Sequence, residues 1–140
     1  MTPPTHLTHV RAPEGIAPGD GHSHVVWGSG RFIAISGQTA LDEAGRPVGA
    51  GDPAAQAGQI FANLARCLAA AGAGFDDVIK LTYYVTDAAH LPAVRAARDA
   101  VIDPAHPPAG SAVRVTALAR PELLLEIEAF AVLPEGPRPL

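Results

Sequence analysis

Two glutamates near the end of the chain have a spacing that could support chemistry. Glu126 and Glu128 flank Ile127 in an apolar run, so in a β-strand both carboxylates project from one face, about 7 Å apart by strand rise. A carboxylate that faces a partly apolar pocket gains a raised pKa and can act as a general acid or base. The alternative is an exposed face of ion pairs, which the spacing taken alone favours.

His22 and His24 are the most closely spaced histidine pair. Residues i and i+2 of a strand point to the same side, so both imidazoles could meet a ligand or a metal. No residue near these two histidines supplies a third metal ligand at a fixed spacing, so we predict no metal site here. The remaining alternatives are a histidine beside a pocket and solvated histidines. Gly37 ends an apolar strand, where a glycine lets a ligand approach the backbone.

Cys67 is the single cysteine, which excludes an intrachain disulfide and a cysteine-based zinc cluster. It falls on the apolar stripe of a predicted helix, which favours a buried hydrophobic role over a nucleophilic one. The chain holds no glycine-rich phosphate loop, no G-x-S-x-G and no H-E-x-x-H sequence. Any chemistry must therefore come from residues that the fold brings together.

The elements that position these residues follow in the order ββ-α-β-α-ββ. The predicted strands cover residues 24–27, 31–36, 78–86, 111–118 and 123–132, and the predicted helices run from 53 to Gly72 or Gly74 and from 87 to 102. This order is typical of an α+β fold, with a mixed sheet and two helices packed on one face. The other face would carry Tyr84, Phe130 and Val132 among charged residues. Because a lone domain would leave that face in water, we expect an oligomer that covers it.

The length of 140 residues corresponds to one domain. Residues 1–20 are rich in Pro and Gly and predict a flexible lead-in, residues 21–133 form the domain, and residues 134–140 form a tail. A net charge of −4 argues against a nucleic-acid partner. The start resembles no secretory signal, and no apolar run reaches about 18 residues, so we expect a cytoplasmic protein without a membrane partner.

Short segments along the chain stand in the order and spacing of one known family. They are Ser23-His24, residues 32–38, 51–56, Asn63-Leu64, residues 68–72, 77–82, 85–87, 106–109 and 125–129. Over residues 21–133 the chain resembles the RidA/YjgF family of reactive-intermediate deaminases, also called endoribonuclease L-PSP-like proteins. The resemblance implies a chorismate-mutase-like fold and a homotrimer with ligand clefts between neighbouring subunits.

The resemblance also implies an activity, namely hydrolysis of 2-imino acids and enamines to 2-keto acids and ammonia, with water and without a cofactor. The glutamate that orients the attacking water in the family matches Glu126. The residues of this sequence expected in the substrate-binding cleft are Gly37, His22, Tyr84, Arg95, Gly110, Ala112 and Arg114.

The chain departs from the family at Gly110, where active members carry an arginine that grips the substrate carboxylate. Such a charge-assisted contact is worth about 1.5–3 kcal/mol, and glycine cannot replace it. Arg95 or Arg114 could restore the contact from another direction, or both could be solvated. Three functional hypotheses follow: hydrolysis or deamination of a reactive imine, enamine or related metabolite, another hydrolysis or tautomerisation in a specialised pathway, and a non-catalytic ligand-binding or regulatory trimer.

Overall fold

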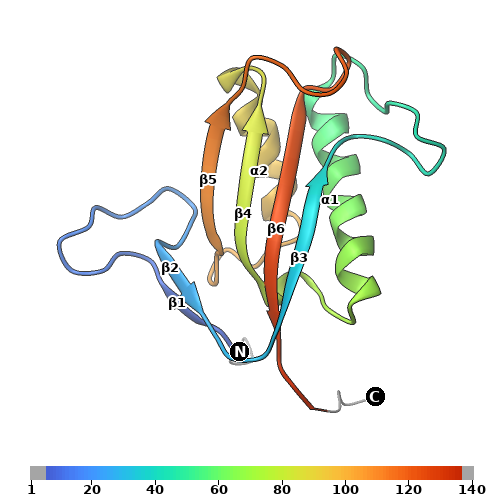
Figure 1. Cartoon of the computed structure of the whole chain (residues 1–140). Helices are drawn as coiled ribbons and strands as arrows, with labels where there is room; N and C mark the ends of the chain where they lie inside the picture. The colour runs from blue at the N-terminus through green and yellow to red at the C-terminus, as the bar shows by residue number, and fades with distance from the viewer. Residues whose placement is uncertain (1–5, 137–140) are drawn as a thin grey trace.

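The computed structural model describes residues 6–136 and consists of two helices packed against one face of a four-stranded mixed sheet (Figure 1). The sheet has the strand order β3-β6-β4-β5, in which β4 and β5 are parallel and the other neighbours are antiparallel. Its strands are β3 (Arg31–Gln38), β4 (Val78–Val85), β5 (Ala109–Arg114) and β6 (Leu125–Leu133). Helices α1 (Pro53–Ala70) and α2 (Leu91–Asp99) lie behind the sheet in Figure 1. This arrangement confirms the predicted α+β class.

Local sequence sets the start of α1 and the position of its buried face. Asp52 caps the helix, because its Oδ1 accepts a hydrogen bond from the Ala55 amide at 3.1 Å, and Pro53 occupies the first helical position, where no amide donor is needed. The apolar side chains at positions 60, 64 and 68 then recur once per turn and are fully buried. The helix ends before Gly72, whose φ of 76° suits glycine.

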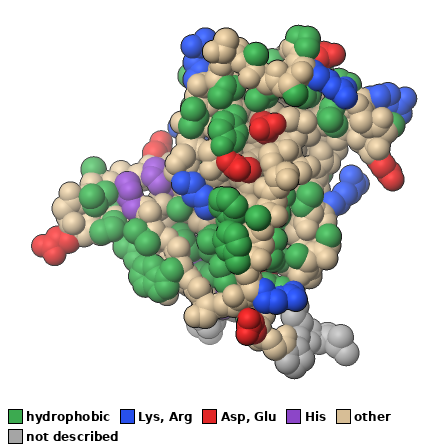
Figure 2. All heavy atoms as spheres, viewed as in Figure 1, with side chains coloured by type: hydrophobic (Ala, Val, Ile, Leu, Met, Phe, Trp, Pro, Cys, Tyr) green, Lys and Arg blue, Asp and Glu red, His purple; other side chains and the backbone are tan. Residues whose placement is uncertain are grey.

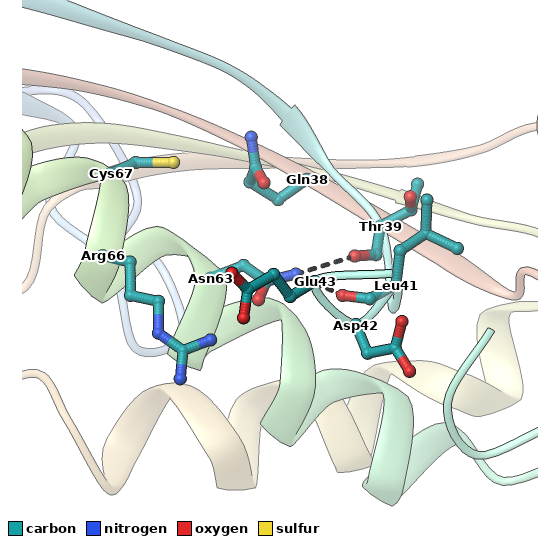
Figure 3. Close-up of a pocket in the computed structure, with 8 residues that line it drawn as sticks. All are labelled: Gln38, Thr39, Leu41, Asp42, Glu43, Asn63, Arg66 and Cys67. Carbon is teal, nitrogen blue, oxygen red and sulfur yellow. Dashed lines mark hydrogen bonds between the residues drawn. The ribbon is translucent and has the colours of Figure 1, made fainter. Parts of the chain in front are cut away.

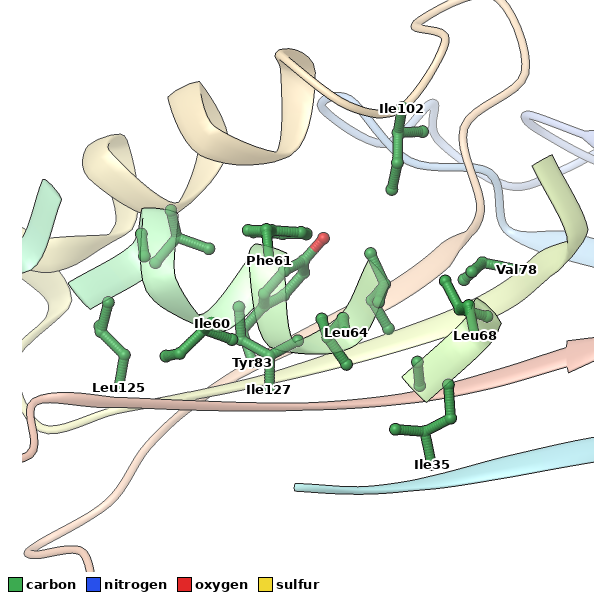
Figure 4. Close-up of a cluster of buried hydrophobic side chains, with 14 of the residues drawn as sticks. Ile35, Ile60, Phe61, Leu64, Leu68, Val78, Tyr83, Ile102, Leu125 and Ile127 are labelled. Atoms are coloured by element: carbon green, nitrogen blue, oxygen red, sulfur yellow. The ribbon is translucent and has the colours of Figure 1, made fainter. Parts of the chain in front are cut away.

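The core fills the space between the helices and the sheet (Figure 4). Alternate residues of the two central strands point into it. They include Leu81, Tyr83 and Val85 of β4 and Leu125, Ile127 and Ala129 of β6. Because strand residues alternate between faces, the residues between these positions point away from the helices. The alternation therefore decides which face carries Glu126 and Glu128.

Several predicted boundaries differ from those in the structure. Strand β5 spans 109–114 rather than 111–118, because its parallel partner β4 ends at Val85 and leaves no ladder beyond Arg114. Helix α2 spans 91–99 rather than 87–102. Asp87 caps a short 3₁₀ turn over Ala88–His90 instead, and Pro92 lies in the first turn of the helix that follows.

The predicted flexible lead-in contains a strand. Strand β1 (Thr8–Val10) pairs antiparallel with β2 (Val25–Trp27), and the two form a small separate sheet. The strand at residues 8–10 was not predicted, because its pairing partner lies about 15 residues further along, beyond the reach of a local pattern. Residues 1–5 of that lead-in and residues 137–140 of the predicted tail lie outside the described part of the chain.

The sheet face opposite the helices combines charged and hydrophobic side chains, as predicted, and Figure 2 views this face. Phe32 is 64% exposed and stacks on Phe130 with 5.4 Å between ring centroids. Val113 of the edge strand β5 is 44% exposed. Val132 pairs with Phe32 and lies on this face as predicted, but it is buried. Within residues 6–136, no helix combines the length and apolar character needed to cross a bilayer.

Candidate active site

Glu126 lies on the open face of the sheet, pointing away from the helices. Its register partner across the β4–β6 ladder is Tyr84, and the partner of Glu128 is Thr82. The neighbours Leu125 and Ile127 point into the core and are 1% and 0% exposed. The buried half of β6 therefore fixes the strand and holds both carboxylates, each partly exposed, on one solvent-accessible face.

Gly37 provides the surface against which the Glu126 carboxylate lies. The β3–β6 register shifts between Ile35 and Gln38, which places Gly37 in a bulge of the strand. A Cβ atom added at Gly37 would lie 2.7 Å from Oε2 of Glu126, closer than the two atoms can approach. The missing side chain thus leaves room for the carboxylate beside bare backbone, and it makes Gly37 and Glu126 parts of one site.

Tyr84 completes this group by binding the second carboxylate. Its hydroxyl donates a hydrogen bond to Oε1 of Glu128. That hydrogen bond, together with desolvation and the negative charges of Glu128 and Glu126, raises the pKa of Tyr84 above its ordinary value. The Glu128 carboxylate is thus hydrogen-bonded to Tyr84. No side chain of residues 6–136 forms a hydrogen bond with the Glu126 carboxylate, so its oxygens are available for a ligand or a water molecule.

Gly37→Ala should lower activity without lowering stability. The new methyl group must displace the Glu126 carboxylate, and a displacement of about 1 Å at a reacting group costs activity by about tenfold or more. The flexible end of a glutamate side chain can move, so the melting temperature should change little.

Gly58→Ala is the matched control, because Gly58 is exposed in α1 with no atom within 4 Å of the added Cβ. This control should stabilise the fold by about 0.5–1 kcal/mol and leave activity unchanged. Equal activity of the two variants would remove Gly37 from the site.

A second group of predicted residues lines a small pocket of about 170 Å³ between β5, α2 and the segment before β2. Four of the predicted residues line it, namely His22, Arg95, Gly110 and Ala112. In the parallel β4–β5 ladder, Gly110 pairs with Leu81 and Ala112 pairs with Tyr83. Since Leu81 and Tyr83 point toward the helices, this pocket opens on the helix side of the sheet, opposite to Glu126.

Ser23 holds the segment before β2 against the start of β5. It is fully buried, its amide donates to the Pro108 carbonyl at 3.1 Å, and its hydroxyl donates to the Pro107 carbonyl at 2.7 Å. These bonds bring His22 next to Gly110, so that a Cβ added to Gly110 would lie 3.8 Å from the Cβ of His22. His24 turns aside, and its Nε2 contacts the Ala17 carbonyl at 2.8 Å. The local sequence Ser23-His24 is thus a structural anchor beside the pocket.

The pocket residues that sequence reasoning missed include Arg98 and Tyr83. Arg98 is 9% exposed and Tyr83 is 8% exposed. Burial raises the pKa of Tyr83. Burial alone would lower the pKa of Arg98, but hydrogen bonds to Asp99 and Tyr83 outweigh burial and hold this pKa above its ordinary value. The sequence does contain a sign that Arg98 points inward, because Arg98 follows Val94 by four residues and so lies on the buried face of α2.

The structure therefore divides the predicted site residues into two half-sites. The first comprises Gly37, Tyr84 and Glu126 on the open face, and the second comprises the pocket lined by Gly110. Arg114 joins neither, because it is exposed at the end of β5, where it pairs with Val85, and it does not line the pocket. Because the predicted cleft lies between subunits, the contribution of Arg114 to it stays a prediction.

A third hollow lies beside Cys67 (Figure 3). This open groove of about 540 Å³ is bordered by α1 and by the segment after β3, where Asn63 Nδ2 donates to the carbonyls of Thr39 and Leu41 at 3.2 and 3.1 Å. Cys67 is half-buried and packs against the core. The groove contains none of the predicted site residues. Cys67, which was expected to be buried, instead borders this groove while packing against the core.

The fold and the two half-sites define a class of small α+β protein in which two helices cover one sheet face and a glutamate lies on the other. The sequence model of a family described as Endoribonuclease L-PSP matches residues 12–133. A RutC family protein of Synechocystis is 34% identical over 126 residues, covering 89% of this chain and 93% of the relative. The chain belongs to this family, the RidA/YjgF proteins.

Solved structures agree with this assignment. The crystal structure of YyfB from Yersinia pestis, described as a Rid family protein of unknown function, has a TM-score of 0.79 and 40% identity, covering 92% of this chain and all of that one. The structure of RidA from an Antarctic Psychrobacter has a TM-score of 0.67 and 29% identity, with coverage of 93% and 100%. The predicted YjgF-like fold is therefore confirmed.

Proposed function

We propose that this protein hydrolyses a small reactive imine, enamine or related metabolite, with Glu126 as the group that handles the water molecule. The observation that carries the proposal is the Glu126 carboxylate beside the bare backbone of Gly37. Water adds its oxygen to the imine carbon while Glu126 accepts a proton. Glu126 returns that proton to the nitrogen, which gives a carbinolamine. The carboxylate then accepts the hydroxyl proton and passes it to the nitrogen as the C=O bond forms and the C–N bond breaks, so that a carbonyl compound and ammonia remain. No cofactor enters this sequence of steps.

We place the reaction in a cleft between two copies of the chain within a homotrimer. The open face carries Glu126 and the helix-side pocket carries Gly110, so one chain cannot direct both toward one ligand. A neighbouring copy that presents its pocket to this open face would bring the half-sites together. The exposed Phe32 and Val113 support this arrangement, because their burial against another copy is favourable. The proposed compartment is the cytoplasm.

The absence of an arginine at position 110 limits which substrates fit. Turnover of the standard 2-imino acids cannot use a guanidinium at position 110, so it must depend on another cation or be slow. A neutral imine or enamine does not need that contact. The preferred substrate therefore depends on whether another cation of the pocket takes the place of that arginine.

The direct test is an assay of imine hydrolysis with the full-length protein. An amino-acid oxidase generates 2-iminobutyrate in place, and release of 2-oxobutyrate is followed with and without the protein. A neutral aldimine is tested in parallel. Acceleration of at least one substrate that Glu126→Gln abolishes would support the proposal. If neither reaction accelerates while small carbonyl compounds bind equally to the unaltered chain and to Glu126→Gln, the protein is a ligand-binding trimer instead.

A further inference from the structure

The buried guanidinium of Arg98 is the strongest unexplained feature of the pocket beside Gly110. Arg98 lies on the face of α2 that packs against the sheet, one turn after the buried Val94. An apolar residue is expected there, because burial of a charge is costly unless partners compensate for it. Within the described chain, its compensating partner is the Asp99 carboxylate, which accepts from Nε at 3.0 Å, and the Tyr83 side chain lines the same pocket.

This partner leaves part of the guanidinium available. The group has five N–H donors, and Asp99 is engaged at Nε only. Asp99 is also the more exposed partner, since its side chain is 56% exposed against 11% for Arg98. Arg98 lines the pocket, whereas Asp99 does not. Among the described residues no hydrogen-bonded partner is seen at the two Nη atoms, and a guanidinium can bind an anion through two parallel bonds.

The segment before β2 approaches the guanidinium of Arg98 closely at Gly21. A Cβ added at Gly21 would lie 2.7 Å from Nη2 of Arg98, and the φ of Gly21 is 76°, which suits glycine. Gly21 thus lets the segment before β2 pass directly over the guanidinium. Together with Tyr83, this contact holds the planar group in one orientation, which lowers the entropy lost on binding.

Gly110 of β5 lines the same pocket as Arg98. A Cβ at Gly110 would meet its nearest atoms, the Leu81 carbonyl oxygen and Cε2 of Tyr83, at 3.6 Å, an ordinary contact distance. Packing therefore does not require glycine there, in contrast to Gly37. The missing side chain leaves open pocket volume in front of the helix wall that carries Arg98 and Arg95.

We infer that Arg98 binds an anionic group of the ligand, a carboxylate by preference, from the helix wall of this pocket. The inference deepens the proposed function and rests on it for the identity of the site. It assigns the carboxylate contact to α2 in place of β5. Arg95 lines the same pocket but is exposed, and Asp20 at the rim carries an opposing negative charge, so the buried and oriented Arg98 is the principal contact.

The test compares binding of 2-oxobutyrate with binding of its neutral analogue 2-oxobutanamide to the full-length protein by calorimetry. Arg98→Gln should weaken 2-oxobutyrate binding by about 10- to 100-fold and change amide binding little. The control Arg66→Gln, an exposed arginine on α1, should change neither. Unchanged 2-oxobutyrate affinity in a folded Arg98→Gln protein would overturn the inference, as would a loss seen only in Arg95→Gln.

A measurement on the unaltered chain covers the case in which Arg98→Gln does not fold. The Nε–Hε resonance of Arg98 should shift on titration with 2-oxobutyrate and stay in place with the amide. An unmoved resonance at saturating 2-oxobutyrate would overturn the inference. Neither readout involves turnover, so a protein that binds through Arg98 without hydrolysing imines would refute the proposed function alone. Hydrolysis that is indifferent to Arg98 would refute the inference alone.

Discussion

Glu126→Gln should lower kcat for imine hydrolysis by about 100-fold or more while ligand affinity stays within a few-fold of the original. A positioned general acid or base contributes about 10²–10⁴-fold, and an amide of the same shape cannot accept the proton of water. The side chain is partly exposed and, among the described residues, makes no hydrogen bond that the fold needs. The melting temperature should therefore be unchanged, and steady-state kinetics with a parallel binding titration separate the two effects.

Glu128→Gln is the matched control for this prediction. Glu128 lies two residues further along the same face, but its carboxylate is occupied by the Tyr84 hydroxyl. Its loss should change kcat by less than about tenfold. If Glu128→Gln reduces kcat as strongly as Glu126→Gln, the two carboxylates act together and the single role given to Glu126 is wrong.

Gln56→Ala should reduce the free energy of unfolding by about 3–5 kcal/mol, enough to unfold a marginally stable domain. Gln56 is fully buried in α1. Its Nε2 donates to the carbonyls of Gly49 and Glu122 at 3.0 and 2.9 Å, and its Oε1 accepts from the Leu124 amide at 2.9 Å. Alanine would remove all three hydrogen bonds and leave a cavity in the core, and of the three backbone groups the Gly49 carbonyl would keep a bond from the Asp52 amide. Denaturant unfolding followed by circular dichroism measures the loss.

Gln59→Ala provides the comparison for Gln56→Ala. Gln59 is also in α1, but it is only partly buried and its shorter contact is with the Asn63 side chain at 2.9 Å. The expected loss is about 1 kcal/mol or less. A similar loss in both variants would show that the three bonds of Gln56 are not specifically responsible. The position of Gln56 also bears on the site, since Leu124 directly precedes the strand that carries Glu126.

Much of the fold was predictable because its signals are local. The alternation from Val78 to Val85 and from Leu125 to Leu133 assigns each residue to a face, and the Asp52-Pro53 pair marks the start of a helix. Strand β1 was missed because its stability comes from a partner strand across a long loop, not from its own three residues. The end of β5 was misplaced because it depends on where the neighbouring strand stops.

The candidate site was predictable as a set of residues but not as an arrangement. Glu126, Gly37 and Gly110 were found from motif order, yet only the ladder register shows that Glu126 and Gly110 point to opposite faces. Arg98 was not predicted as a site residue, because a charged residue on a short helix is ordinarily solvated. The burial of Arg98 depends on contacts with Tyr83 and Gly21, which come from distant segments. Arg95 and Arg98 both line the pocket; the spacing from Val94 indicates the inward face for Arg98, but only tertiary packing shows that its guanidinium is buried there.

The central claim is that one functional site needs two copies of the chain, and mixing two inactive variants tests it most directly. Glu126→Gln removes the open-face carboxylate, and Ala112→Phe fills the small pocket. The two proteins are co-expressed in equal amounts, and imine hydrolysis is compared with each variant alone. Because each shared site draws its halves from two copies, about one quarter of the sites combine both intact halves, so the mixture should recover about one quarter of the original activity. A mixture no more active than its inactive parents would show that the halves do not meet between copies.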